Sequence, residues 1–403
     1  MRIAFLTPEY VREGHPHGGL ANYLSKICPL LQGSGHDPVV FLLGKENATT
    51  EVKGVPLREV KRPRFPWRLL PRRTRAWGEF FDQRLGSRAL HKAFARENAH
   101  SPFDIVQAAS SGGIGDAFVG KVGPPVVVRL STLSVLWRAA QGKKLRFAEH
   151  LTDWLFVNAI QRADGVFAPS QLLAGYAERL LNVPASVVRS PFFVPLEAED
   201  SSVVDRELAG KSYLLFFGKL NRLKGADVLA EALPEIFAAF PDVHVAFAGT
   251  DKGRFSNGLT YGEYACKRAG KWSNHVHLLG NLPRAKLLPV IRGATLVVLP
   301  SRIDNYPNTC LEAQSLGKIV VGTRNSSLDE MVTEGETGFL AESGNPSLLA
   351  QATARGLSLS AEQIAGFTDR IRSHVAARSN DKVIGNLTDF YRGVLDASGG
   401  RPV

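Results

Sequence analysis

The chain has 403 residues, of which 44 % are hydrophobic and 22 % are charged, and its formal net charge is +11. This composition is ordinary for a soluble globular protein, and the length favours two domains over one. Three scattered cysteines exclude a disulfide framework, and no apolar run is long enough to span a membrane. Since a strand, not a signal peptide, begins at the N-terminus, we expect a cytoplasmic protein, free or at the inner face of the membrane.

Short β-rich runs alternate with helical patterns along the first half, which is typical of βαβ units. The expected strands are Arg2–Thr7, Pro38–Leu43, Ile105–Gln107, Val126–Leu130 and Gly165–Ala168. The expected helices are Gly19–Leu31, Trp77–Glu97 and Phe147–Arg162. Gly18 and Gly19 follow the first strand and open a helix, where backbone N–H groups can contact a phosphate.

Much of the positive charge is concentrated in residues 60–78, which hold seven Lys or Arg and no acid. Phe65, Trp67 and Trp77 are interleaved with these cations. The segment is compatible with contact to an anionic membrane surface, and equally with a solvated loop or a groove for an acidic acceptor. Because the charge is confined to one segment and no recognition motif is present, we do not expect nucleic-acid binding.

A second series of elements follows a polar linker, which we place at residues 197–210 between domains 1–196 and 211–378. The expected strands are Tyr213–Gly218, Val243–Ala248, His275–Leu279, Ala294–Leu299 and Ile319–Gly322. The expected helices are Ala226–Phe240, Arg284–Ile291 and a terminal helix at Asp381–Leu395.

Two loops of this second series carry side chains suited to a sugar nucleotide. After the first strand, Lys219 and Lys224 can neutralise a diphosphate, and Gly218 permits close backbone approach. Asp304 follows the strand Ala294–Leu299, and Asn308 or Thr309 could cap the next helix, which would place Glu312 in its first turns. Carboxylates at the carboxyl ends of strands suit a ligand rich in hydroxyls. A solvated basic loop and an ordinary loop acid are the alternatives.

Residues 301–322 and their continuation to Leu340 resemble the paired-acid signature of GT-B glycosyltransferases, specifically the retaining enzymes of glycosyltransferase family 4. Asp304 replaces the usual first Glu, residues 305–308 replace a Gly-rich middle, and Glu312 lies in an intact Leu-Glu-Ala. The resemblance covers most of residues 1–360. It implies an α/β fold with two Rossmann-like domains facing across a cleft, and a helix in residues 379–403 that crosses back to the N-terminal domain.

The resemblance also implies roles for individual residues. Glu312 would bind the ribose hydroxyls, Asp304 the sugar hydroxyls, and Lys219 and Lys224 the diphosphate; these four are the expected catalytic residues. The other expected donor-binding residues are Gly18, Gly19, Gly218, Thr250, Asn305, Tyr306, Pro307, Asn308 and Thr309. The expected acceptor-binding residues are His17, Arg129, Ser131 and Thr132. Ser131 stands where the family often has His, and a structural ion pair is the alternative for Arg129.

These features together predict a retaining hexosyltransferase that moves a sugar from a UDP- or GDP-type donor to an acceptor hydroxyl, in the synthesis of a cell-surface glycan or polysaccharide. The acceptor would be a glycan or a lipid-linked sugar. Because no Asp-x-Asp pair is present, we expect neither a metal ion nor another cofactor. The alternatives are a non-catalytic protein that binds sugar nucleotides, a glycosyltransferase that acts on a small soluble acceptor, and an epimerase or phosphorylase on the same fold.

Overall fold

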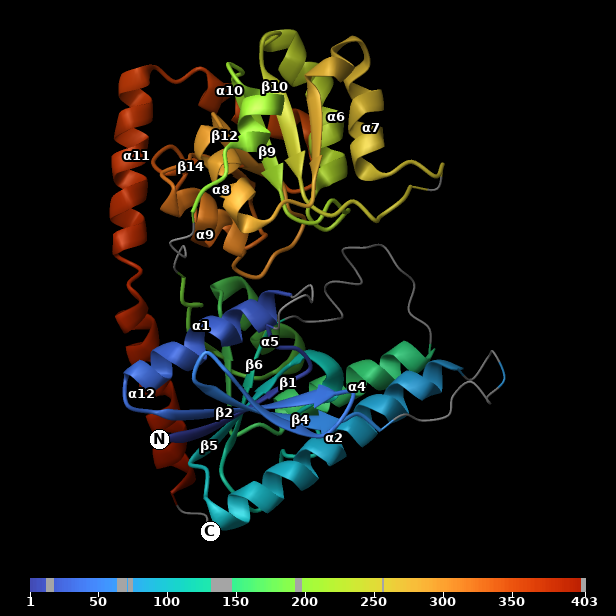
Figure 1. Cartoon of the computed structure of the whole chain (residues 1–403), viewed down its shortest axis with the longest axis vertical. Coiled ribbons are helices and arrows are strands. Elements are labelled where there is room, and N and C mark those ends of the chain that lie inside the picture. The colour runs from blue at the N-terminus through green and yellow to red at the C-terminus, as the bar shows by residue number, and fades with distance from the viewer. Residues whose placement is uncertain are drawn as a thin grey trace. The chain divides into compact units, whose positions relative to one another are not determined.

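The structure is a computed structural model that describes residues 1–11, 18–63, 71, 75–131, 147–192, 198–255 and 257–399. It forms two compact units, each with its own sheet and core (Figure 1). The first unit consists of Met1–Pro191 with Asn380–Val403, and the second of Phe192–Ser379. The segment expected as a linker falls in the second unit, where the Asp200 N–H donates to the Ala285 carbonyl.

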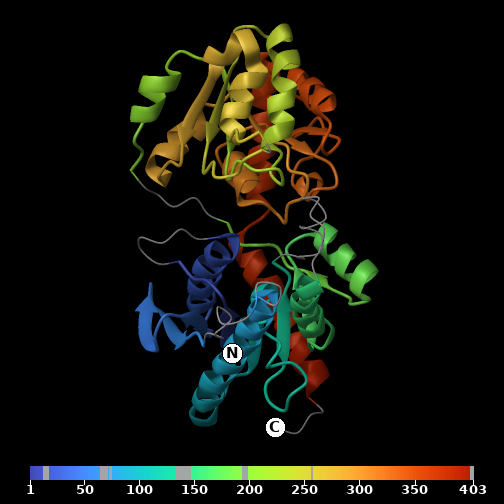
Figure 2. The same ribbon diagram turned by 90° about the vertical axis from the view of Figure 1, so that its right-hand side faces the viewer.

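The first unit is built on an eight-stranded sheet in the order β3-β4-β2-β1-β5-β6-β7-β8, parallel except for the β3–β4 pair. Its strands are β1 Arg2–Thr7, β2 Asp37–Gly44, β3 Ala48–Val52, β4 Val55–Lys61, β5 Ile105–Ala109, β6 Val126–Arg129, β7 Gly165–Ala168 and β8 Ser186–Val187. Its helices are α1 Gly19–Gly33, α2 Arg75–His100, α4 Phe147–Gln161, α5 Gln171–Leu181 and α12 Asn380–Ser398. Helices cover both faces of the sheet (Figures 1 and 2).

The strands of this sheet alternate their side chains between two apolar cores. Ala4 and Leu6 of β1 face the core that includes Phe94 of α2. Ile3 and Phe5 face the core under α1 and α12. Because both faces are covered, the strands read as nearly continuous apolar runs, which is why most of them could be predicted.

The C-terminal helix α12 packs on the first unit, so the predicted helix that returns to the N-terminal domain is confirmed. Its buried residues are Val383, Ile384, Leu387, Thr388, Tyr391 and Val394. The Tyr391 O–H donates to Oε1 of Gln107 in β5 at 2.5 Å. The last helix of the chain therefore completes a core whose strands lie more than 200 residues earlier.

The second unit is built on a six-stranded, wholly parallel sheet in the order β11-β10-β9-β12-β13-β14. Its strands are β9 Tyr213–Phe217, β10 His244–Ala248, β11 Val276–Gly280, β12 Leu296–Leu299, β13 Val320–Thr323 and β14 Gly338–Ala341. Its helices are α6 Ala226–Ala239, α7 Tyr261–Ala269, α8 Arg284–Gly293, α9 Asn308–Ser315, α10 Pro346–Leu357 and α11 Ala361–Ala376.

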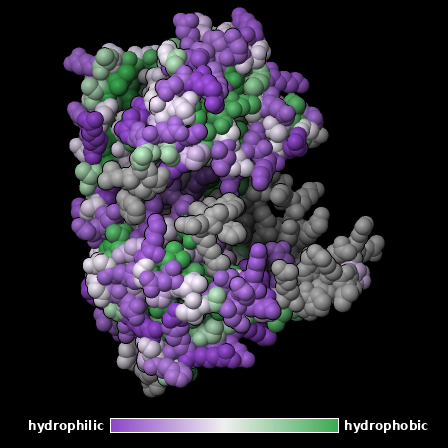
Figure 3. All heavy atoms as spheres, viewed as in Figure 1, coloured by the Kyte–Doolittle hydropathy of each residue, from purple (hydrophilic) through white to green (hydrophobic). Residues whose placement is uncertain are grey.

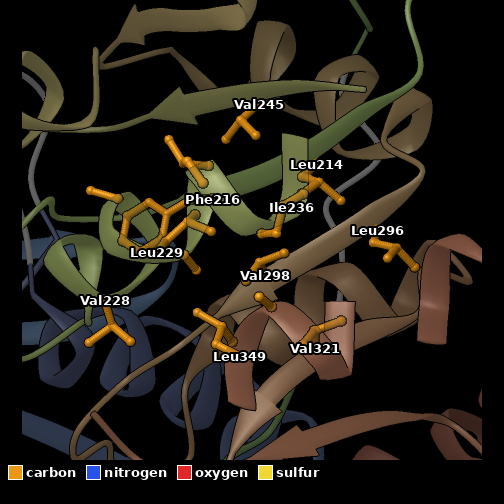
Figure 4. Packing of buried hydrophobic residues seen from close by; sticks show 14 of the residues in the cluster. Leu214, Phe216, Val228, Leu229, Ile236, Val245, Leu296, Val298, Val321 and Leu349 are labelled. Carbon is orange, nitrogen blue, oxygen red and sulfur yellow. The ribbon is translucent and has the colours of Figure 1, made fainter. Parts of the chain in front are cut away.

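One face of this second sheet packs against α6 and α10. Leu214 and Phe216 of β9 and Val298 of β12 lie close to Leu229 and Ile236 of α6 (Figure 4). The other face packs against α8 and α9. This doubly wound arrangement brings the loops after β9, β10, β11 and β12 to one edge of the sheet, where ligands of such folds bind.

The outer surface is mainly hydrophilic on the face shown in Figure 3, with hydrophobic residues in small separate groups. Among the described residues, no helix has the length and apolar character needed to cross a membrane. Residues 64–70 and 72–74 of the basic segment lie outside the described residues, so the predicted membrane contact of residues 60–78 stays a prediction. Within that segment, Lys61 and Arg62 are exposed.

Candidate functional site

The loops that follow β9 and β12 contact each other directly. Gly225 has a φ of 71°, and a Cβ built on it would lie 1.8 Å from the carbonyl oxygen of Pro300. Only glycine fits such a position. A side chain would clash with the neighbouring backbone, and a residue with a Cβ is strained in the left-handed conformation. A Cβ on Gly218 would lie 3.7 Å from Cγ2 of Thr309, so the start of the β9 loop is also close to α9.

Lys224 and Asp304, which are 80 residues apart in the chain, form an ion pair in this contact. Lys224 Nζ lies 2.5 Å from Asp304 Oδ2, and the Asp304 side chain is only 8 % exposed. The same carboxylate accepts hydrogen bonds from the Ser301 hydroxyl at 3.1 Å and the Asn305 N–H at 2.9 Å. Charge-assisted hydrogen bonds of this kind hold both groups in a fixed geometry.

The other cations of the β9 loop are free to meet a ligand. Lys219 and Arg222 are exposed, and neither forms a salt bridge with any residue that the structure describes. The loop itself is held by the Asn221 side chain, whose Oδ1 accepts from the Lys224 N–H at 2.9 Å. It is also tied to the end of β10, since the Leu220 N–H donates to the Thr250 carbonyl at 3.0 Å.

Helix α9 begins at Asn308 with Pro307 as its N-cap, so the expectation that Asn308 or Thr309 caps the helix was wrong. Pro307 has a φ of −66°, which suits the entry into a helix. Its side chain has no atom that can accept a hydrogen bond from the first N–H groups of the helix. Tyr306 before it is buried with a φ of 58°, and its N–H donates to the Ser327 hydroxyl at 2.8 Å. With no side-chain cap among the described residues, the start of α9 favours a negative ligand group.

Glu312 lies one turn further along α9 and is paired with an arginine that sequence reasoning missed. Arg284 Nη1 donates to Glu312 Oε1 at 2.9 Å, and the two side chains are 28 % and 14 % exposed. Arg284 is the first residue of α8, where the helix dipole disfavours a cation. That unfavourable position is the one sequence signal that could have marked it.

In the first unit, Gly18 and Gly19 lie at the start of α1, where Gly18 is the N-cap without a side-chain cap. The carboxylate of Glu9 lies beside them. Its Oε1 accepts from the Ala21 N–H at 3.4 Å, and a Cβ on Gly18 would lie 2.6 Å from the same oxygen. Glu9 was not singled out from the sequence. This acid lies at the N-terminus of α1, where a phosphate contact was expected.

Arg129 is buried in the first unit, where its side chain stacks on an aromatic ring. Its Cζ lies 3.8 Å from the centre of the Tyr23 ring, and Nη2 donates to the Ser190 hydroxyl at 3.0 Å. Burial lowers the pKa of Arg129 and raises that of Tyr23 to about 12. No described carboxylate forms a salt bridge with Arg129, so the alternative of a structural ion pair has no support among the residues that the structure describes.

The remaining acceptor-side predictions are placed only in part. Ser131 follows β6, and its hydroxyl lies 3.2 Å from that of Ser110. His17 and Thr132 lie outside the described residues. The described residues contain no group of three or more His, Cys, Asp or Glu that could hold a metal ion.

A groove of about 1570 Å³ lies in the first unit, between the loops after β1, β2 and β4 and one side of α2. Five cations that line it form no salt bridge with any described residue: Lys45, Lys61, Arg62, Lys92 and Arg96. A sixth, Arg58, is paired with Glu97 at 2.8 Å. Four carboxylates, Glu9, Glu46, Glu59 and Glu97, also line the groove, so its cations exceed its acids by two and the lining favours a negatively charged ligand only modestly.

Both halves of the chain match known sequence families. Residues 18–191 match the family described as glycosyl transferase 4-like domain, and residues 211–358 match the family described as glycosyl transferases group 1. The chain belongs to the group 1 glycosyltransferases of glycosyltransferase family 4. The two matches together span most of the chain and follow the two units of the structure closely.

Solved structures show that the fold of this group 1 family member is GT-B. Sucrose-phosphate synthase from Thermosynechococcus elongatus aligns with a TM-score of 0.78 and 17 % identity, over 98 % of this chain and 100 % of that one. HepE from Anabaena, solved in complex with UDP, aligns with a TM-score of 0.67 and 18 % identity, again over 98 % and 100 %.

Among curated proteins, the chain is similar to the D-inositol 3-phosphate glycosyltransferase of Corynebacterium urealyticum, with 30 % identity over 179 residues. That match covers 44 % of this chain and 42 % of the relative, so less than half of the relative's length is matched.

Proposed function

We propose that this chain is a retaining, metal-independent glycosyltransferase that moves a hexose from a nucleotide diphosphate sugar to an acceptor hydroxyl in glycan synthesis. The second unit would bind the donor and the first unit the acceptor. The observation that carries the proposal is the meeting of Lys224, Asp304 and the uncapped start of α9 at the carboxyl ends of β9 and β12. Membership of the family supports it.

The geometry favours departure of a diphosphate. As the bond between the sugar C1 and the phosphate oxygen breaks, negative charge grows on the phosphate. Lys219, Lys224 and the N–H groups at the start of α9 would stabilise that charge more in the transition state than in the ground state. Asp304 keeps Lys224 in place and remains near the sugar hydroxyls. Glu312 would accept hydrogen bonds from the ribose.

The carboxylate of Asp304 is poorly suited to act as a nucleophile. Both of its oxygens accept hydrogen bonds, and Lys224 and Ser301 share Oδ2. This supports a front-face displacement, in which the acceptor oxygen bonds to C1 on the side from which the phosphate leaves. The proton of the acceptor hydroxyl would pass to the leaving phosphate oxygen, so the configuration at C1 is retained.

The donor class can be tested with nucleotides alone. We expect at least one of UDP, GDP, ADP or TDP to raise the melting temperature, and Glu312→Ala to abolish that shift. HepE was solved with UDP, which makes UDP the first candidate. A chain that none of these nucleotides or their sugars stabilises would contradict the proposal. Binding without turnover on any acceptor would favour the alternative of a non-catalytic binding protein.

The basic groove of the first unit supports an acceptor that carries a phosphate or a carboxylate. The curated relative named above acts, by its name, on a phosphorylated inositol. We expect the double variant Lys92→Gln with Arg96→Gln to raise KM for an acidic acceptor about tenfold, because each lost charge contact at a partly screened site weakens binding modestly. Lys267→Gln on α7 is the matched control and should leave KM unchanged. An equal KM for the acidic acceptor and its uncharged analogue would contradict this part of the proposal.

Contact of residues 60–78 with the inner face of a membrane is part of the proposal for a lipid-linked acceptor. Flotation of the full chain with vesicles of anionic and of neutral lipid tests it. Binding to anionic vesicles that salt reverses is the expected result. Without such binding, the alternative of a small soluble acceptor would be favoured.

A further inference from the structure

The guanidinium of Arg284 is only partly used by the protein. Nη1 donates to Glu312 Oε1, whereas Nε and Nη2 are buried and have no hydrogen-bond partner among the described residues. Buried donors without an acceptor are rare in native structures because each loses its hydration without replacement. Nε and Nη2 of Arg284 therefore need an acceptor that the described residues do not supply.

Helix stability does not explain why residue 284 is an arginine. It is the first residue of α8, and its charge opposes the dipole at that end. Its N-cap Pro283 offers no side-chain acceptor. The contact that explains an arginine here is the ion pair with Glu312. That ion pair leaves most N–H donors of the guanidinium without an acceptor.

Glu312 is also only partly used. Its Oε1 accepts from Arg284, but Oε2 accepts no hydrogen bond from the described residues. The pair thus offers an acceptor oxygen and N–H donors side by side. A vicinal diol is a matching group, because each hydroxyl can donate one hydrogen bond and accept others, and its two oxygens are held close together.

We propose that Arg284 is a specificity-determining residue that, together with Glu312, binds the 2′,3′-diol of the donor ribose. This rests on the proposed function. One ribose hydroxyl donates to Glu312 Oε2, and the unpartnered N–H groups of Arg284 donate to the diol oxygens. The site then selects ribonucleotide donors and discriminates against 2′-deoxyribonucleotides such as those of dTDP-sugars, because the missing hydroxyl leaves buried groups unpaired.

The test compares UDP with 2′-deoxy-UDP, and GDP with 2′-deoxy-GDP, by isothermal titration of the full chain. For the nucleotide that binds, the wild type should prefer the ribose form by about tenfold or more. In Arg284→Met, the ratio of the two dissociation constants should fall to within about threefold, chiefly because the ribose form binds more weakly. Arg284→Lys keeps the charge but loses the planar fork, so it should also lose most of the discrimination.

Arg292→Met is the matched control, since Arg292 lies on the same helix and is paired with Glu199 on the surface. It should keep the wild-type ratio. If Arg284→Met melts as the wild type does and keeps the full ribose preference, Arg284 is a structural link between α8 and α9 and the inference is wrong. A wild type that binds ribose and deoxyribose forms equally also overturns it, while the proposed function stands. A wild type that binds no nucleotide overturns the proposed function itself.

Discussion

Gly225 is the residue on which the shape of the loop after β9 depends most. Its φ of 71° and the 1.8 Å between its built Cβ and the Pro300 oxygen leave no room for a side chain. We expect Gly225→Ala to lower the free energy of unfolding by about 3 kcal/mol or more, since the contact is with backbone that cannot rotate away. Urea denaturation measures the loss.

Gly335→Ala is the control for backbone strain alone. Gly335 has a φ of 74°, and no heavy atom lies within 4 Å of its built Cβ. This change should cost about 1 kcal/mol. Equal losses for the two alanine variants would mean that the β9 and β12 loops do not approach as closely as the structure places them.

Lys224 and Asp304 should depend on each other for stability as well as for activity. Removing the cation in Lys224→Met leaves a nearly buried carboxylate without its counter-charge, which we expect to cost about 2 kcal/mol. This is less than for a wholly buried pair, because the Lys224 side chain is 25 % exposed. Adding Asp304→Asn should recover about half of that loss. A double-mutant cycle by urea denaturation with strictly additive losses would show that the pair is not coupled.

The sequence located the candidate site better than it located the partners within it. Asp304, Glu312 and Lys224 follow strand, loop and helix signals that are local in the chain, so pattern and resemblance could single them out. Glu9 belongs to no motif of this kind, and the one signal at Arg284 is a cation at the start of a helix. Arg284 pairs with a residue 28 positions away and Glu9 with one 12 positions away, and only the folded chain brings them together.

At the level of elements, the buried parallel strands were predictable and the edge hairpin was not. Strands β9 and β12 are apolar throughout because both faces of the sheet are covered. Strands β3 and β4 pair antiparallel around a turn of Lys53 and Gly54, both with positive φ. β3 is mostly exposed and polar, and Lys-Gly is a weaker hairpin signal than Asn-Gly, so its pattern resembles a loop.

Helix α12 should be needed for the stability of the first unit. In Tyr391→Phe the buried Gln107 Oε1 loses the donor at 2.5 Å, which we expect to cost about 1–2 kcal/mol. Gly393→Ala on the exposed side of the same helix has open space around the new methyl group. It should raise the free energy of unfolding by about 0.5–1 kcal/mol through helix propensity. A Tyr391→Phe variant as stable as the wild type would mean that the hydrogen bond contributes nothing.

At the scale of the molecule, each unit has its own sheet and its own apolar cores, so the two units are expected to unfold in separate steps. Two domains could be predicted from the length and from the repeated alternation of strands and helices. The assignment of α12 to the first unit could not be derived from periodicity and came only from the resemblance. An amphipathic pattern shows that a helix has a buried side but not which core covers it.

The second unit should lose stability in acid, because three histidines meet at the edge of its sheet. His244 stacks on His275 with ring centres 4.3 Å apart, and its Nδ1 lies 3.1 Å from Nε2 of His277. Burial, these neighbours and Lys211 lower the pKa of His244 to about 4. The pKa of His277 is also lowered, chiefly by burial and Lys211, while Glu207 acts in the opposite direction.

Since the unfolded chain binds a proton at His244 near pH 6.5 and the folded chain only near pH 4, stability is complete above pH 6.5 and falls as the pH drops toward 4. Calorimetry of the full chain between pH 7.5 and 4.5 should show the transition of the second unit moving to lower temperature. His244→Gln, which cannot take up the proton, should reduce that movement, whereas His100→Gln on α2 of the first unit should leave it unchanged. Only a side chain whose pKa differs between the folded and the unfolded chain can couple stability to pH in this range. If the melting temperature of the second unit falls equally in the wild type and in His244→Gln, other groups cause the acid sensitivity.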